Sequence, residues 1–373
     1  MPGETRKILL DARLVAYRRG GIARYTSGLL ANLPAVAPDL HVRAVANRPA
    51  DTAGTPVTRV LTPPHHRLER LSLGFELTVR RPSLIHAVDF IPPRAPKAIR
   101  RIATVHDLAF LKHPELVTPE SARYYGQAAK ALGEADRVIT VSRYTAADVS
   151  RLLGVPEERV TTIYNAVDDA FFAAATERQA DRPEVIPAIP PDRPLILIVG
   201  TIEPRKRHQL LFDALTVSHP VLRDCAPLLV VVGQAGWRSR TTVAHLQAAI
   251  AADRAIWFEN ADDEMLRALY RSATLLAMPS LDEGFGLPAV EAMASGVPVI
   301  ASSRGALPEV LGDAALLIED DNPDGWADVI AGILTDRALR ERLRERGYRR
   351  AETYRWSRTA SDTARVYREV LSA

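Results

Sequence analysis

Short apolar runs alternate with amphipathic stretches along the whole chain. In the first half we expect strands at residues 7–10, 42–46, 84–87, 102–105, 138–141 and 160–163, and helices at residues 22–33, 68–79, 121–132 and 145–153. In the second half we expect strands at residues 195–199, 228–232, 256–258, 275–277, 297–301 and 315–318, and helices at residues 207–215, 243–252, 263–272, 289–294, 326–334, 338–352 and 357–371. This alternation predicts an α/β protein with parallel sheets.

A proline-rich segment interrupts the alternation in the middle of the chain. Residues 174–194 show no periodicity and include five prolines, which is typical of a linker or a surface loop. The chain has 373 residues, which is more than a single hydrophobic core usually supports. We therefore expect one domain over residues 1–173 and a second over residues 195–356. The last predicted helix has no strand after it and can pack away from its own sheet.

Composition and charge narrow the class of protein. No apolar run approaches the roughly 18 residues of a membrane span, and no signal-peptide core is present, so we expect a cytoplasmic protein. Cys225 is the only cysteine, which excludes an internal disulfide. Up to Phe171 the chain has 24 Lys and Arg against 17 Asp and Glu, whereas the remainder has 24 against 28. The basic first half is either a solvated surface or suited to an anionic partner: nucleic acid, a diphosphate or a membrane.

The most informative stretch is PSLDEGFGLPAVEAMASGVP at residues 279–298. It follows a predicted strand, and open α/β sheets bind ligands at the carboxyl ends of their strands. Gly284 and Gly286 let the backbone approach a ligand, and Glu283 and Glu291 bracket the start of a predicted helix. Two carboxylates at this place suit hydroxyl groups of a sugar ring and of a ribose. The alternative is that they stabilise the amino end of the helix.

The same stretch resembles the E-x7-E motif of the family 4 retaining glycosyltransferases, which have the GT-B fold. Further stretches resemble signatures of that family in the same order: Asp11-Ala-Arg, Gly20-Gly-Ile-Ala-Arg-Tyr, Thr104-Val-His-Asp-Leu108, Val141-Ser-Arg-Tyr144, Asn165-Ala-Val-Asp168, Gly200-Thr-Ile-Glu-Pro-Arg-Lys206, Gly305-Ala-Leu-Pro-Glu309 and Tyr354-Arg-Trp356. The resemblance implies two Rossmann-like domains whose parallel sheets face each other across a cleft. It also implies that residues 357–373 pack back on the first domain.

The resemblance also implies roles for individual residues. Glu283 is expected to contact the donor sugar and Glu291 the ribose, while Arg205 and Lys206 hold the diphosphate. A basic pair directly after a strand is well placed for this, although it could also be a solvated helix start. Many relatives have an arginine where this chain has Thr201, which leaves the number of diphosphate contacts open.

Further site residues follow from the resemblance. His106, which comes directly after a predicted strand, is implied as a catalytic residue next to the donor sugar together with Glu283. Donor contacts are also expected at Gly21, Gly284, Phe285, Gly286 and Leu287, and acceptor contacts at Gly20, Ser142 and Arg143. Ser142 is explained equally well as a helix N-cap. The Gly20-Gly21 loop lacks the G-x-G-x-x-G pattern, so it does not indicate NAD binding.

The expected activity is that of a retaining hexosyltransferase without a cofactor or bound metal, because no Asp-x-Asp pair follows a strand. The co-substrate would be GDP-mannose or a UDP-sugar, and the commonest expectation is mannosyl transfer to a glycan or lipid-linked acceptor in polysaccharide biosynthesis. Peripheral contact with an anionic membrane at the inner face is a further expectation, and nucleic acid is not an expected partner. The alternatives are a nucleotide-sugar epimerase, a disaccharide synthase, or a non-catalytic partner subunit.

Overall fold

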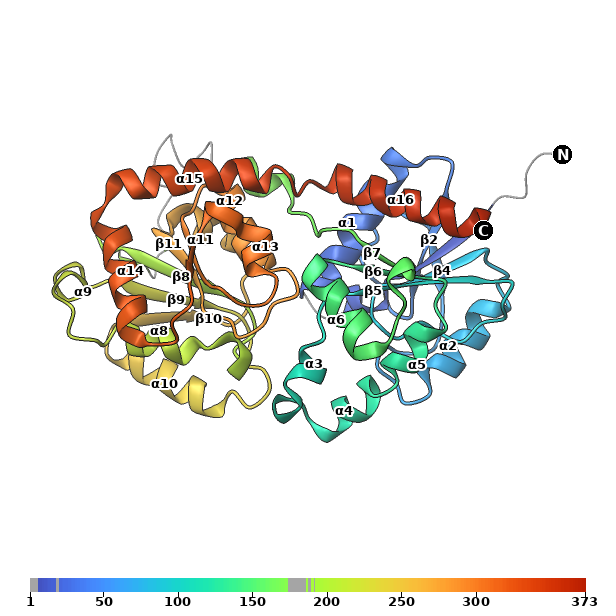
Figure 1. The fold of residues 1–373 in the computed structure, drawn as a ribbon, viewed down its shortest axis with the longest axis horizontal. Helices are drawn as coiled ribbons and strands as arrows, with labels where there is room; N and C mark the ends of the chain where they lie inside the picture. The colour runs from blue at the N-terminus through green and yellow to red at the C-terminus, as the bar shows by residue number, and fades with distance from the viewer. Residues whose placement is uncertain (1–5, 18–19, 174–185, 187–188, 191) are drawn as a thin grey trace. The chain divides into compact units, whose positions relative to one another are not determined.

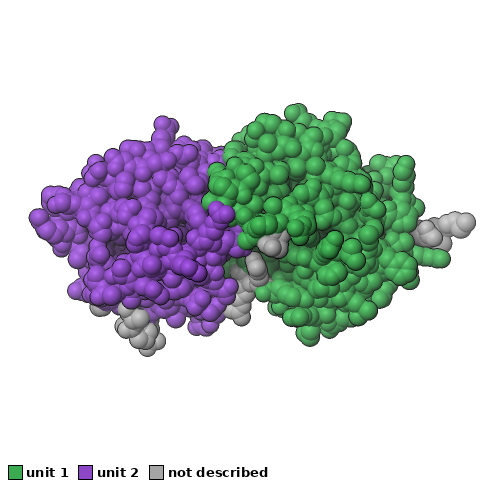
Figure 2. Space-filling model, turned by 90° about the horizontal axis from the view of Figure 1, so that it is seen from below, with its two compact units in different colours: residues 1–166, 355–373 green, residues 167–354 purple. Residues whose placement is uncertain are grey.

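The computed structural model describes residues 6–17, 20–173, 186, 189–190 and 192–373. The chain forms two compact units, which we call unit 1 (residues 1–166 and 355–373) and unit 2 (residues 167–354) (Figure 2). The second unit thus begins before the segment in which we expected the linker, and most of residues 174–194 lie outside the described residues. In the described part of the chain, no helix is long and apolar enough to cross a membrane.

Unit 1 contains a seven-stranded parallel sheet in the order β3-β2-β1-β4-β5-β6-β7 (Figure 1). Its strands are β1 (Lys7–Asp11), β2 (His41–Ala46), β3 (Val57–Arg59), β4 (Leu84–Ala87), β5 (Arg100–Val105), β6 (Arg137–Thr140) and β7 (Val160–Thr162). The strand order reverses between β1 and β4, and ligands of open α/β sheets bind at such a switch point.

The helices of unit 1 cover both faces of this sheet. They are α1 (Gly21–Val36), α2 (Glu69–Thr78), α3 (Ala109–Lys112), α4 (Pro119–Tyr125), α5 (Ala128–Gly133), α6 (Arg143–Leu153) and α16 (Trp356–Ser372), with 3-10 helices at Arg13–Ala16, Pro114–Leu116 and Glu157–Arg159. On one face, α1 and α16 share a buried core with β1. On the other face, α2 buries Leu73 and Leu77.

Helix α16 joins unit 1 although it follows unit 2 in the chain. Its residues Ala360, Ala364 and Tyr367 are completely buried in the core that includes α1. Gly28 on α1 makes room for it, because a Cβ atom there would lie 2.0 Å from the ring of Trp356. The last helix therefore completes the core of the first sheet.

Unit 2 contains a six-stranded parallel sheet in the order β10-β9-β8-β11-β12-β13 (Figure 1). Its strands are β8 (Leu195–Val199), β9 (Leu228–Val232), β10 (Ala255–Phe258), β11 (Leu275–Met278), β12 (Val299–Ser302) and β13 (Leu316–Ile318). Its helices are α8 (His208–Ala214), α9 (Pro220–Cys225), α10 (Arg240–Ala251), α11 (Asp263–Ser272), α12 (Leu287–Ala294), α13 (Leu307–Leu311), α14 (Pro323–Thr335) and α15 (Arg337–Ala351), with 3-10 helices at Pro204–Lys206 and Gly312–Ala314. The switch point of this sheet lies between β8 and β11.

Candidate active site

Two loops meet at the carboxyl edge of the unit 2 sheet. One follows β8 and contains the 3-10 helix Pro204–Lys206, and the other follows β11 and leads into α12. Nζ of Lys206 donates a hydrogen bond to Oε1 of Glu283 at 2.5 Å, and Nη1 of Arg205 lies 3.5 Å from Oε2 of the same carboxylate. Because β8 and β11 are parallel neighbours, their loops emerge side by side. The structure thus brings together three residues that were predicted from two separate motifs.

Glu283 is buried but charged. Burial alone would raise the pKa of Glu283, yet the charges of Lys206 and Arg205 and the hydrogen bond from Lys206 outweigh it, so that its pKa lies below the ordinary value. The carboxylate is therefore ionised at neutral pH. It holds the ammonium group of Lys206 at the strand edge, and the contact of Lys206 with a diphosphate stays a prediction.

Arg205 links the two loops by further contacts that sequence reasoning did not identify. Its guanidinium donates to the carbonyl oxygen of Asp282 at 2.6 Å and to Oε1 of Glu203 at 2.8 Å. Its own carbonyl oxygen accepts from the backbone N–H of Leu281 at 2.8 Å. Glu203 lies inside one of the family-like stretches, but nothing in its local sequence says that it orients Arg205.

A third loop, after β12, packs against the backbone of Glu283. The N–H of Ala306 donates to the carbonyl oxygen of Glu283 at 2.8 Å. Gly305 has φ of +63°, and a Cβ atom there would lie 2.6 Å from the backbone nitrogen of Glu283. Only glycine fits this close approach, so Gly305 fixes the backbone that carries the carboxylate.

Helix α12 begins after Gly286, which has φ of +87°. Glu291 lies on this helix and is 3% exposed, and its Oε2 accepts a hydrogen bond from Oη of Tyr270 on α11 at 2.9 Å. The structure therefore anchors Glu291 by a residue that we did not predict, and its contact with a ribose stays a prediction.

The neighbouring candidates in this loop differ in their surroundings. Phe285 is buried and packs edge-on against Tyr354, with ring centroids 5.3 Å apart. Gly284 is also buried, whereas Leu287 is half-buried at the first position of α12. The side chain of Phe285 thus contributes packing, and any contact of this residue with a donor would come from its backbone.

His106 follows β5 near the switch point of unit 1. Its Nε2–H donates to the carbonyl oxygen of Val88 at 3.0 Å, and the ring of Tyr25 packs edge-on against it at 5.0 Å. Burial lowers the pKa of His106, and the nearby carboxylate of Asp89 offsets this only in part. The neutral ring therefore presents Nδ1 as a hydrogen-bond acceptor.

A buried polar network lies directly beneath His106 in unit 1. Nδ1 of His86 lies 2.7 Å from Oη of Tyr367 on α16, and Nε2 lies 2.8 Å from Oγ1 of Thr104. Thr104 also lies within 3.2 Å of Oη of Tyr25, whose ring contacts His106. Burial lowers the pKa of His86 to about 3, so this ring is neutral.

The acceptor-side candidates occupy helix starts at the carboxyl edge of unit 1. Gly20 is the N-cap of α1, and a Cβ atom at Gly20 or Gly21 would meet no atom within 4 Å. Ser142 is the N-cap of α6, as the sequence indicated, and its Oγ accepts from the N–H of Thr145 at 3.1 Å. Arg143 is exposed at the next position. The roles of Gly20, Ser142 and Arg143 toward an acceptor, and of Gly21 toward the donor, stay predictions.

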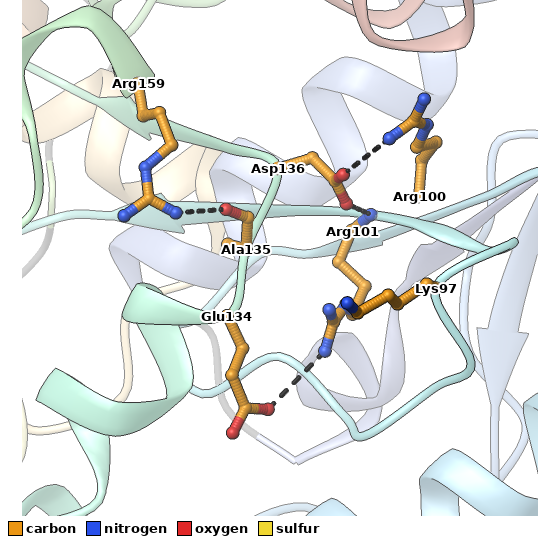
Figure 3. Close-up of a pocket in the computed structure, with 7 residues that line it drawn as sticks. All are labelled: Lys97, Arg100, Arg101, Glu134, Ala135, Asp136 and Arg159. Carbon is orange, nitrogen blue, oxygen red and sulfur yellow. Dashed lines mark hydrogen bonds and ion pairs between the residues drawn. The ribbon is translucent and has the colours of Figure 1, made fainter. Parts of the chain in front are cut away.

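A pocket of about 340 Å³ lies at the opposite edge of the unit 1 sheet (Figure 3). Its lining comprises Lys97, Arg100, Arg101, Glu134, Ala135, Asp136 and Arg159. Arg100 pairs with Asp136 at 3.0 Å and Arg101 with Glu134 at 3.5 Å. Since β5 and β6 begin here, the pocket is at the amino edge, and it contains no predicted site residue.

Metal ligands were not expected from the sequence. In the parts of the chain that the structure describes, no three His, Cys, Asp or Glu side chains are grouped so that they could hold a metal ion.

Comparison with known proteins covers both units. Residues 19–171 match the family model described as Glycosyltransferase Family 4, and residues 181–350 match the model described as Glycosyl transferases group 1. The predicted site residues all fall within these two ranges.

Individual relatives extend this similarity. The O-antigen chain mannosyltransferase B of Escherichia coli is 28% identical over 290 residues, which are 76% of this chain and 74% of that protein. The D-inositol 3-phosphate glycosyltransferase of Salinispora tropica is 32% identical over 287 residues, which are 73% of this chain but only 59% of that protein. Sucrose-phosphate synthase from Thermosynechococcus elongatus has a similar structure, with a TM-score of 0.78 at 22% identity, covering 98% of this chain and 99% of that one. The expected GT-B fold with two parallel sheets is confirmed.

Proposed function

Because the chain belongs to family 4 of the glycosyltransferases, we propose that this enzyme transfers a hexose with retention from a nucleotide diphosphate sugar to a glycan or lipid-linked acceptor. The donor that we propose is GDP-mannose. The second choice is a UDP-sugar that carries another hexose. The similarity to an O-antigen chain mannosyltransferase supports mannose and a polysaccharide product.

The observation that carries the proposal is the cluster of Arg205, Lys206 and Glu283 at the switch point of unit 2. Breaking the bond between a sugar and a diphosphate leaves negative charge on the departing phosphate. A planar guanidinium and an ammonium group at the strand edge can stabilise that charge without a metal ion. We propose that the carboxylate of Glu283, which lies beside both cations, accepts hydrogen bonds from sugar hydroxyls.

The remainder of the proposal concerns the surroundings of the enzyme. Nucleotide sugars are supplied on the cytoplasmic side, so we place the enzyme there, in peripheral contact with the inner membrane when its acceptor is lipid-linked. The net positive charge of the first half of the chain supports such a contact.

The test begins with thermal unfolding in the presence of GDP, UDP, ADP and dTDP, because a ligand that binds only the folded state raises the melting temperature. The nucleotide that stabilises the wild type should have a weaker effect on Lys206→Met, whereas Lys130→Met on α5 in unit 1 serves as the control.

The cognate nucleotide sugar is then incubated with acceptor preparations, with and without EDTA. If no nucleotide stabilises the protein, the proposal is wrong; loss of turnover in EDTA with recovery in Mg²⁺ contradicts the metal-free part alone. Release of a small free sugar would identify an epimerase or a disaccharide synthase instead.

A further inference from the structure

Helix α2 of unit 1 exposes an apolar stripe. Leu68, Leu71, Phe75 and Val79 are 55%, 53%, 74% and 64% exposed, respectively. Their spacing of three, four and four positions places them on one face of the helix. Single exposed apolar residues are common on protein surfaces, but a continuous patch of large ones marks a surface that binds something.

The fold fixes this face outward. Leu73 and Leu77, on the opposite face of α2, are buried in the core beneath the sheet. A Cβ atom at Gly74 would lie 2.1 Å from the carbonyl oxygen of Arg94, so the backbone of α2 is pressed against its neighbour. Arg70, also on the inner side, pairs with Glu134 at 2.7 Å. The stripe therefore cannot turn inward without loss of the core.

A fifth apolar residue extends the stripe. Leu61 is 90% exposed, and its backbone N–H donates to Oε2 of Glu76 on α2 at 2.6 Å. This hydrogen bond holds the loop that carries Leu61 beside the helix. The carboxylate of Glu76 also accepts from the N–H of Thr62 at 3.0 Å, so its charge is taken up by this loop.

The exposed charges at the two ends of the stripe are positive. Arg67 precedes it, and Arg80 and Arg81 follow it, all three exposed. The remaining acid of the helix, Glu69, is buried in an ion pair with Arg13. A surface of aliphatic and aromatic side chains between arginines is complementary to the interface of an anionic bilayer, where apolar groups enter the acyl region and arginines meet phosphates.

We propose that the stripe Leu68–Leu71–Phe75–Val79 on α2, together with Arg67, Arg80 and Arg81, docks unit 1 onto an anionic lipid membrane. This inference rests on the proposed function, because membrane docking would bring the enzyme to a lipid-linked acceptor. A helix of ten residues lies in the plane of the interface and does not span the bilayer. The lipid-facing residues lie outside the donor site, so docking and donor binding are separable.

The experiment measures co-sedimentation of the full chain with vesicles of phosphatidylcholine alone or mixed with phosphatidylglycerol. The double variant Leu71→Ser, Phe75→Ser removes apolar contacts, and Arg80→Glu, Arg81→Glu reverses the charge. The matched control is Ile250→Ser, which changes an exposed apolar residue on α10 of unit 2. Melting temperature and nucleotide binding are measured on every variant, so that a folding defect or a failed donor site is recognised separately.

The wild type and Ile250→Ser should bind the anionic vesicles, and high salt should weaken the binding. Each stripe variant should bind on the order of 10-fold or more weakly, because the apolar area or the charge that enters the interface is lost. Unchanged binding of the stripe variants would overturn the proposal. So would the absence of vesicle binding together with a wild-type dimer that Leu71→Ser, Phe75→Ser converts to monomer, since the stripe would then join two copies of the chain.

Discussion

The switch points of the two sheets have the same topology but different chemistry. In unit 2, the loops after β8 and β11 bring Arg205 and Lys206 to a charged carboxylate, that of Glu283. In unit 1, Asp11 at the end of β1 pairs with Arg13 at 2.6 Å, whereas the nearby rings of His106 and His86 have lowered pKa values. Glu283 of unit 2 is thus a charged group beside two cations, whereas the two histidine rings of unit 1 are neutral.

This difference follows from what surrounds each group. Glu283 is as deeply buried as a core residue, but two cations within 3.5 Å keep it ionised. His86 is also buried, but its partners are the hydroxyls of Tyr367 and Thr104, which cannot stabilise a positive charge as a carboxylate would. A buried group is therefore ionised in one case and neutral in the other, depending on whether an opposite charge lies beside it.

The largest effect is expected when the charged switch point loses its carboxylate. Glu283→Gln should lower kcat on the order of 100-fold, because the sugar is no longer positioned, while the affinity for the free nucleoside diphosphate changes little. Glu264→Gln is the matched control, since Glu264 is an exposed acid in the first turn of α11, outside the cluster. The measurement is steady-state turnover with nucleotide titration. Wild-type turnover by Glu283→Gln would remove this carboxylate from catalysis.

A smaller effect is expected at the buried carboxylate of unit 2. Glu291→Ala should weaken nucleotide binding roughly 10- to 100-fold, which corresponds to the loss of hydrogen bonds from ribose hydroxyls to a charged acceptor. Tyr270→Phe separates this from packing, because it removes the hydrogen bond to Glu291 without removing the carboxylate. Calorimetric titration with the nucleotide measures both. Equal losses in the two variants would indicate that Glu291 only anchors α11 to α12.

Removal of the neutral His106 ring should lower activity less than the two changes in unit 2. His106→Ala should reduce kcat/KM about 10-fold, the value of one hydrogen bond between neutral groups. His106→Asn keeps an acceptor atom near the position of Nδ1 and should restore part of the activity. Full activity of His106→Ala would show that His106 takes no part in catalysis.

Sequence patterns identified most of the sheet because buried parallel strands are continuous apolar runs. The strands Leu195–Val199 and Leu228–Val232 occupy the residues that we expected. The edge strand Val57–Arg59 was not predicted, because three residues, two of them polar, give no such run. The helix expected at residues 121–132 is two helices, and the interruption lies at Gly126, where helix propensity is low.

The candidate site was predictable to the extent that it lies in local motifs. Glu283, Arg205 and Lys206 could be named from two short stretches, each directly after a strand. Tyr270 could not, since its contact with Glu291 depends on which helices are neighbours, and a local sequence pattern does not specify strand order. The exposure of the stripe on α2 could not be predicted either, because the same periodicity is typical of a helix whose apolar face is buried.

The smallest effect, a change in stability with pH, tests whether the buried ring of His86 in unit 1 is neutral. The pKa of His86 is lowered from 6.5 to about 3 in the folded protein, so the unfolded chain binds a proton in a pH range where the folded protein does not. Stability is therefore full above pH 6.5 and is lost as the pH falls toward about 3, with a slope on the order of 1 kcal/mol per pH unit from this residue. His86→Gln cannot titrate, and denaturant unfolding across this range should give a shallower slope for this variant than for the wild type. Identical slopes would mean that the buried ring accepts a proton in the folded state, and the contrast between the charged Glu283 and the neutral histidine rings of unit 1 would no longer hold.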